Sequence, residues 1–179
     1  MPEWNPIAKM CVTKPSFHFM NMAYNDYKVD NAPCKAGVTN QCAVRMSVAL
    51  NRCGFDLEAF KNQKRIHKNR KSCKLTVPHV LGARELAKYL SESWGPPIKF
   101  AGGGVESAPF VFHRRKGVIY FDNCFIRKGQ TKKTGDHIDL WTGITYYNEI
   151  IKVSAGGSAQ VGTPLFGESK EVWFFPLAG

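Results

Sequence analysis

A cysteine stands where a polar segment turns into an amphipathic helix. Cys42 lies at the predicted first turn, within the stretch Asn40-Gln41-Cys42-Ala43-Val44-Arg45-Met46-Ser47. The free N–H groups and positive end of a helix N-terminus stabilise a thiolate, the nucleophilic form of cysteine. The same N–H groups can hold an oxyanion. Cys42 is therefore a candidate nucleophile; the alternative is a buried, small hydrophobic residue.

A cysteine nucleophile needs an imidazole base, and the imidazole needs a third polar group that orients it. The chain has five histidines. His137 is distinct among them because it opens an alternating segment, Asp136 to Trp141, that is typical of a strand. On a sheet face its ring can point at a helix N-terminus packed on that sheet. The alternative is an ordinary polar residue on a solvated strand face.

Two residues could orient the His137 ring, and the spacing leaves both open. Asp139 shares its strand face but lies about 7 Å further along the strand, so a straight contact with the ring is not expected. Asn148 follows the turn at Gly143 and could reach the ring from the next strand, where facing neighbours lie about 5 Å apart.

The elements that must position these residues fall into two halves. Helical spacing of apolar residues predicts helices from Pro15 to Tyr27, from Cys42 to the C-cap at Gly54, and from Pro78 to the stop at Trp94-Gly95-Pro96-Pro97. Strands are predicted after them, at 117–121, 136–141, 144–151 and 172–175, with a long loop at 154–167. Helices followed by an antiparallel sheet indicate an α+β fold. We expect one domain over residues 1–179.

Charge and cysteine spacing limit the function. The net charge of +11 favours polyanionic partners such as nucleic acid, anionic lipid head groups or acidic cell-wall polymers. The first residues do not resemble a secretory signal, and no apolar run has transmembrane length. The six cysteines are scattered without a C-x-x-C pair, so neither a zinc site nor a dense disulfide framework is indicated. We expect no metal and no cofactor.

Two motifs together resemble a known family. The Cys42 to Ser47 segment and Gly135-Asp136-His137-Ile138-Asp139-Leu140-Trp141-Thr142-Gly143 are similar to motifs of the fourth family of type VI secretion amidase effectors. The resemblance implies a papain-like, NlpC-type cysteine peptidase that cuts peptidoglycan stem peptides between D-glutamate and meso-diaminopimelate. In this likeness Cys42 is the nucleophile and His137 the base. The third residue, commonly aspartate, falls by ungapped counting on Asn148, with Asp139 as the alternative.

The resemblance also implies a mechanism. Cys42 attacks the γ-D-glutamyl carbonyl, the Cys42 N–H and the Gln41 side chain hold the oxyanion, and His137 protonates the leaving amine. We assign Gln41, Arg45 and Trp141 as candidate substrate-binding residues; Arg45 could instead form an internal ion pair.

Partners and location follow from the same resemblance. We expect a peptidoglycan stem peptide as substrate, a cognate immunity protein and the type VI secretion machinery, without nucleic acid or membrane insertion. The antibacterial toxin would be made in the cytoplasm without a signal peptide and delivered into the periplasm of a target bacterium.

Two functions of other classes remain open. A basic run could hold phosphates, which would make the chain a nucleic-acid-binding protein or an RNA-cleaving toxin; its members are Lys61, Lys64, Arg65, Lys68, Arg70, Lys71 and Lys74. The run lacks a recognised nucleic-acid motif and an aromatic stacking platform. The other function is a cell-wall binding module with an inactive site. Muropeptide release that iodoacetamide blocks would distinguish an enzyme from both.

Overall fold

The computed structural model describes residues 14–25, 34, 40–57, 66–67, 79–146 and 164–179. Within these ranges no helix combines the length and apolar character that crossing a bilayer requires.

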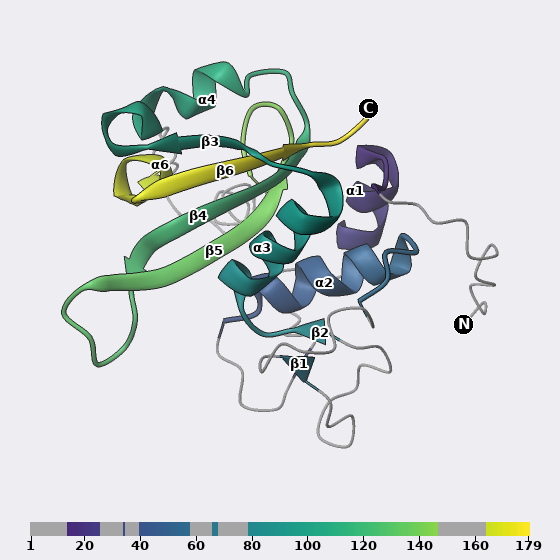
Figure 1. Cartoon of the computed structure of the whole chain (residues 1–179), viewed down its shortest axis with the longest axis horizontal. Helices are drawn as coiled ribbons and strands as arrows, with labels where there is room; N and C mark the ends of the chain where they lie inside the picture. The colour runs from purple at the N-terminus through teal and green to yellow at the C-terminus, as the bar shows by residue number, and fades with distance from the viewer. Residues whose placement is uncertain (1–13, 26–33, 35–39, 58–65, 68–78, 147–163) are drawn as a thin grey trace.

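An antiparallel sheet of four strands forms the centre of the described structure (Figure 1). The spatial order is β3-β6-β4-β5, so β5 is an edge strand of this sheet among the described residues. The strands are β3 Ile98–Ala101, β6 Glu171–Pro176, β4 Gly117–Ile126 and β5 Lys133–Trp141. A separate two-stranded sheet joins β1 Ile66–His67 to β2 His79–Val80.

Helices cover both faces of the sheet. The larger hydrophobic cluster packs one face, including Val118 and Ile138, against three helices: α1 Phe17–Asn25, α2 Cys42–Arg52 and α3 Ala83–Trp94. The smaller cluster packs the other face, including Phe121 and Trp141, against η3 Gly102–Ser107, α4 Ala108–Val111 and α6 Pro164–Glu168. Because both faces are covered, the first five residues of β4 are all buried and read as a continuous apolar run.

The predicted helices are present with shifted ends. α1 buries Phe17, Met20 and Tyr24, which lie one helical turn apart. The helix that starts with Cys42 ends at Arg52, and Gly54 follows it with φ 84°. The prediction that the third helix begins at Pro78 is wrong, because α3 begins at Ala83 and Val80 belongs to β2.

The predicted strands at 117–121, 136–141 and 172–175 are confirmed, and two of them extend into a longer hairpin. The apolar spacing did not predict β3 or α6. Of the strand predicted at 144–151, the described part contributes one isolated bridge between Trp141 and Tyr146. Residues 147–163, and all members of the basic run after Phe60, lie outside the described residues.

Candidate active site

Cys42 is the first residue of α2 and is 2% exposed. Its backbone N–H donates to Asn40 Oδ1 at 3.2 Å. Asn40 therefore caps this helix start with its side chain, although Gln41 is the residue next to the helix. An oxyanion that used the Cys42 N–H would have to displace the Asn40 side chain.

The edge of the sheet meets this helix start. The backbone N–H of Ile138 on β5 donates to the Cys42 sulfur. The side chain of His137 hydrogen-bonds the same sulfur. An edge strand has backbone groups that no neighbouring strand uses, which leaves the Ile138 N–H available for a thiolate. The structure thus brings together the predicted nucleophile and the predicted base, which are far apart in the sequence.

The His137 ring also contacts Asp139. Its Nε2 lies 3.3 Å from Asp139 Oδ2, so Nδ1 is the ring nitrogen left for the thiol. The other carboxylate oxygen accepts the Leu140 N–H at 2.9 Å, and the side chain of Tyr24 on α1 hydrogen-bonds the same carboxylate. These bonds hold Asp139, which is 1% exposed, in one orientation toward the imidazole.

This contact corrects the expectation that Asp139 would not reach the His137 ring. The two side chains share a strand face, and they lean along the strand toward each other, so together they span the distance between their backbones. Asp139 is thus the orienting group that the described residues supply. Asn148, the other candidate, lies outside the described residues.

The electrostatics of the pair favour a thiolate beside an imidazolium. Burial raises the pKa of Cys42, but the hydrogen bond and charge of His137, with the Ile138 N–H, outweigh burial and lower that pKa below its ordinary 9.0. Burial lowers the pKa of His137, but hydrogen bonds to Asp139 and Cys42 outweigh burial and raise it to about 9. The positive N-terminus of the helix at Cys42 also stabilises the thiolate.

The pKa values of two other thiols are shifted in the opposite direction, upward. Burial raises the pKa of Cys53 to about 11 and that of Cys124 to about 12. No disulfide joins the described cysteines, Cys34, Cys42, Cys53 and Cys124. The microenvironment of Cys42 is therefore the reactive one among these three shifted thiols.

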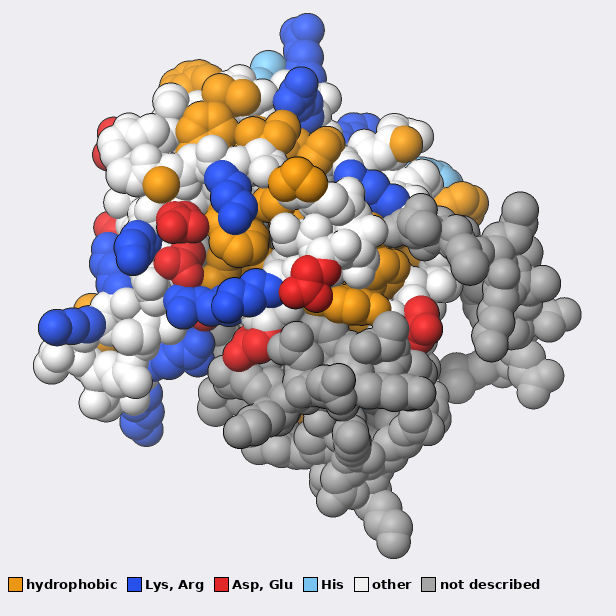
Figure 2. Space-filling view, viewed as in Figure 1, with side chains coloured by type: hydrophobic (Ala, Val, Ile, Leu, Met, Phe, Trp, Pro, Cys, Tyr) orange, Lys and Arg blue, Asp and Glu red, His pale blue; other side chains and the backbone are white. Residues whose placement is uncertain are grey.

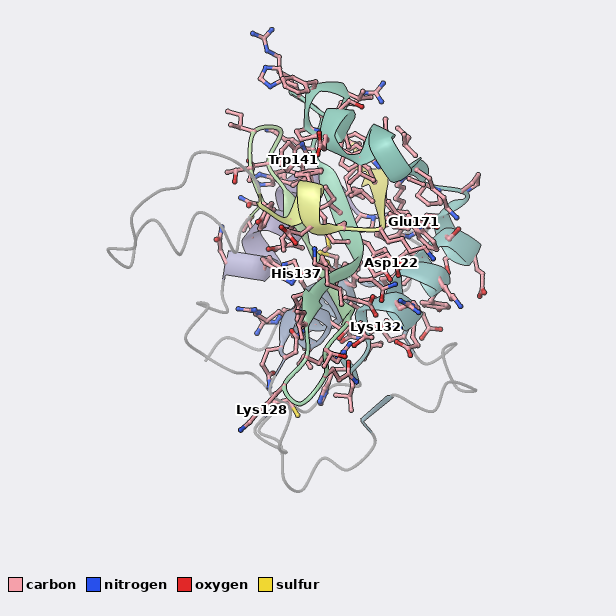
Figure 3. The ribbon with its side chains drawn as sticks, turned by 90° about the vertical axis from the view of Figure 1, so that its left-hand side faces the viewer. Asp122, Lys128, Lys132, His137, Trp141 and Glu171 are labelled. Atoms are coloured by element: carbon pink, nitrogen blue, oxygen red, sulfur yellow. The ribbon has the colours of Figure 1, made fainter. Side chains whose placement is uncertain are left out.

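Aromatic rings enclose His137. Figure 3 shows His137 midway along β5, between the hairpin tip at Lys128 and the far end of the strand at Trp141. The ring of Phe121 lies 6.3 Å from the imidazole with 29° between the planes, and the ring of Tyr146 lies 6.2 Å away at 62°. Such apolar walls limit rotation of the imidazole and strengthen its bonds to Cys42 and Asp139.

Gln41 and Arg45 make internal contacts. The Gln41 side-chain amide donates to Cys34 O at 2.7 Å and accepts from Cys34 N–H at 3.1 Å, which joins Cys34 to the start of α2. Arg45 is 8% exposed, and its charge lowers the pKa of Tyr24 against the larger effect of burial. The geometry therefore favours the internal role for Arg45 over contact with a substrate carboxylate.

Trp141, the third residue predicted to bind substrate, packs into the core in the structure. Trp141 is 1% exposed, its Nε1–H donates to Phe112 O at 3.0 Å, and its ring packs edge-on against Phe166. Alternation along β5 places Trp141 on the face of His137, but four residues further along, where that face is covered by η3, α4 and α6. Trp141 is a core residue.

The Cys42–His137 pair is enclosed rather than open. His137 is 6% exposed, and neither of the two cavities found among the described residues is lined by Cys42 or His137. One, of about 630 Å³, is lined by Arg114, Arg115 and Lys116 with four other residues; another, of about 470 Å³, is lined by Arg84, Arg127, Asp136 and four others. A substrate that reaches the thiol must displace the atoms that cover it. Among the described residues, no group of three His, Cys, Asp or Glu side chains is arranged to hold a metal ion.

Two participants were missed from the sequence. The helical spacing of Tyr24 indicates only a core residue, yet a buried phenol needs a partner for its O–H, and that requirement is the signal that could have found its contact with Asp139. The Ile138 N–H carries no sequence signal, since its availability depends on β5 lying at the edge of the sheet.

One family of known proteins matches most of the chain. Residues 38–175 match the family described as "Type VI secretion system (T6SS), amidase effector protein 4". Three similar solved structures are the effector Tae4 from Salmonella typhimurium with the immunity protein Tai4 from Enterobacter cloacae, the Enterobacter cloacae Tae4 alone, and the Enterobacter cloacae Tae4–Tai4 complex.

All three are 18% identical to this chain, with a TM-score of 0.59. In the order given, the matches cover 93%, 92% and 92% of this chain and 100%, 97% and 99% of the solved chains. At that identity the likeness shows a shared fold, and the fold agrees with the predicted α+β class in a single domain. No curated protein matches the chain.

Proposed function

The chain belongs to the family of type VI secretion system amidase effectors, fourth class, and from that premise we propose that it is a cysteine amidase of peptidoglycan. The bond that it hydrolyses is the γ-D-glutamyl–meso-diaminopimelate amide of the stem peptide. One observation supports this proposal above the others: a buried thiol at a helix start hydrogen-bonds an imidazole that a carboxylate orients.

The proposed reaction uses the proton that His137 already carries. The Cys42 thiolate attacks the γ-D-glutamyl carbonyl carbon and forms a tetrahedral oxyanion. As the C–N bond breaks, the imidazolium of His137 gives its proton to the diaminopimelate amine, which leaves a thioester on Cys42. Water then attacks the thioester and loses a proton to neutral His137. The γ-carboxylate departs, and the thiolate–imidazolium pair is restored.

Asp139 does not take up a proton in this cycle. Its carboxylate fixes the imidazole with Nε2 toward itself and Nδ1 toward the thiol, and it stabilises the positive charge on the ring. The positive N-terminus of α2 and the backbone N–H groups near Cys42 supply the field that an oxyanion needs.

The product of digestion tests the substrate and the bond together. Purified sacculi are incubated with the protein, and the released muropeptides are identified by mass spectrometry. The proposal predicts stems that end at D-glutamate and new free amines on diaminopimelate. Fragments cut at another bond would overturn the assignment of the bond. If the sacculi stay intact while the protein degrades RNA in a separate incubation, the nucleic-acid alternative is supported.

We expect a bell-shaped pH dependence of kcat/KM. As the pH rises through about 9, His137 loses the proton that the leaving amine needs, so the rate falls. As the pH falls through the lowered pKa of Cys42, the thiolate is protonated and the rate falls again. Hydrolysis of a soluble stem peptide, measured from about pH 5 to about pH 10, checks this. A rate that is still rising at the alkaline end would contradict it.

The proposal includes delivery and inhibition. Two of the solved relatives are effectors bound to an immunity protein named Tai4, and we propose that this chain has such an inhibitor in the producing cell. Because the substrate of the proposed reaction lies in the periplasm, the protein fused to a secretory signal should lyse a Gram-negative host, whereas the same protein retained in the cytoplasm should not. Lysis from the cytoplasm, or none from the periplasm, would contradict the proposed target.

A further inference from the structure

A charged cluster joins α3 to the part of the sheet that carries His137. Arg84 Nη2 lies 2.7 Å from Asp122 Oδ1, 3.1 Å from Asn123 Oδ1 and 3.1 Å from Asp136 Oδ1. Arg84 Nε lies 3.4 Å from the hydroxyl of Tyr120. We call these five residues the Arg84 cluster. Figure 2 shows basic and acidic side chains side by side on this flank of the molecule, toward the β4–β5 hairpin.

The cluster sits at a break in the pairing of β4 with β5. Phe121 pairs with His137, and the next pair along the hairpin joins Phe125 to Gly135. Three residues of β4 therefore face Asp136 alone, which makes a β-bulge directly beside the candidate base. Bulges bend a strand and re-aim its side chains, and they are frequent next to active sites.

Asp136 supplies the contact that closes the bulge. The N–H of Asn123 donates to Asp136 Oδ1 at 3.1 Å, and Arg84 contacts the same oxygen. Asn123 has φ 49°, a left-handed conformation that asparagine tolerates better than most residues. Asn123 Nδ2 also donates to Asp122 Oδ2 at 3.0 Å. The side chains of the bulge are therefore tied to each other and to Arg84.

Arg84 is the cation that makes this arrangement stable. The side chains of Asp122 and Asp136 are 14% and 10% exposed, so two nearly buried carboxylates lie side by side. Bonds to the Tyr120 hydroxyl and the charges of Asp136 and Asp122 raise the pKa of Arg84 further above its ordinary value. Without the guanidinium the carboxylates would repel each other across the bulge.

We propose that Arg84 is a positioning residue for catalysis: by clamping Asp136 and the bulge, it sets the direction in which β5 presents His137 to Cys42. Asp136 and His137 share one planar peptide, and their Cα atoms are about 3.8 Å apart, so a turn of Asp136 swings the imidazole. A displacement of about 1 Å at a reacting group can cost about 100-fold in rate. This inference rests on the proposed function.

The variant Arg84→Met tests the inference, with Arg127→Met as its matched control. Arg127 Nη2 lies 4.0 Å from Asp136 Oδ2, and its side chain is 38% exposed against 42% for Arg84. Both variants remove one guanidinium beside the same carboxylate, but among the described contacts only Arg84 bonds to the bulge residues Asp122 and Asn123. Hydrolysis of a soluble stem peptide gives kcat and KM, and an NMR titration gives the pKa of the His137 imidazole.

Arg84→Met is expected to lower kcat about 10- to 100-fold with KM nearly unchanged, since the loss is in alignment rather than in substrate binding. The pKa of His137 should fall from about 9, because the ring no longer meets Cys42 and Asp139 at the same distances. Arg127→Met should change kcat by less than about twofold.

Should Arg84→Met fail to fold, Arg84→Lys is the second variant. A single ammonium keeps the charge but cannot reach all of the oxygens that the guanidinium fork reaches, so kcat and the pKa of His137 should still fall. A folded Arg84 variant with the wild-type kcat and the wild-type His137 pKa would overturn the inference. Activity retained in Cys42→Ala would overturn the proposed function alone. The NMR titration of His137 needs no turnover, so it would still test whether Arg84 positions the imidazole.

Discussion

Cys42→Ala is expected to reduce muropeptide release by roughly 10⁵-fold, to the background of the assay, because removing a covalent nucleophile removes the whole catalytic pathway. The matched control is Cys53→Ala, which removes a cysteine at the other end of the same helix. Cys53 follows the last residue of α2, and burial raises the pKa of its thiol to about 11. Cys53→Ala should retain nearly full activity.

One variant removes the thiol at the first residue of α2 and the other the thiol directly after its last residue, so a difference between them reports on the reactivity of Cys42 rather than on helix stability. Denaturant unfolding of each variant identifies any loss of fold. Equal activity of Cys42→Ala and wild type would overturn the proposed nucleophile. Equal loss in the two variants would trace the effect to the helix and not to catalysis.

The second large effect is expected for Asp139→Asn. The variant removes the carboxylate that faces His137 Nε2, so the ring can adopt the wrong tautomer and its positive charge is less stabilised. A comparable change in a serine protease costs about 10⁴ in kcat, and we expect a loss of roughly 10²- to 10⁴-fold here. The alkaline limb of the pH profile should also move to lower pH, since the hydrogen bond to Asp139 is the largest of the contacts that raise the pKa of His137.

Two further variants distinguish Asp139 from its alternatives. Tyr24→Phe removes one hydrogen bond to the carboxylate and leaves the carboxylate in place, so its effect should be less than about tenfold. Asn148→Ala tests the residue on which the family's third catalytic position falls by ungapped counting. A full loss in Asn148→Ala beside a wild-type rate in Asp139→Asn would transfer the orienting role to Asn148.

The sequence predicted the parts of the fold that depend on local periodicity. The helix that begins at Cys42 and the strand that carries His137 follow from apolar spacing over whole elements. The start of α3 was missed by five residues, because Pro78 is a common first residue of a helix and Val80 fits the helical spacing, yet tertiary pairing places Val80 in β2. Short elements such as β3 and α6 have too few residues for a period to show.

For the candidate site, the sequence identifies the residues whose type the proposed chemistry determines. Cys42 and His137 were chosen by their reactivity and by the elements that carry them, and the structure places them in contact. The contact of Asp139 depends on how two side chains lean along one strand, and the burial of Trp141 depends on which helices cover that face of the sheet. The bulge beside His137 depends on the pairing of β4 with β5, which no residue pattern reveals.

Site-resolved alkylation shows whether the Cys42 thiolate is the nucleophile of the reaction. The native protein is treated with iodoacetamide at neutral pH, and mass spectrometry follows the labelling of each cysteine while muropeptide release is measured on the same samples. We predict that activity falls in proportion to labelling of Cys42, that Cys53 and Cys124 react far more slowly, and that His137→Ala slows the labelling of Cys42. Undiminished release from protein fully labelled at Cys42, or loss of release while Cys42 stays unlabelled, would contradict the account.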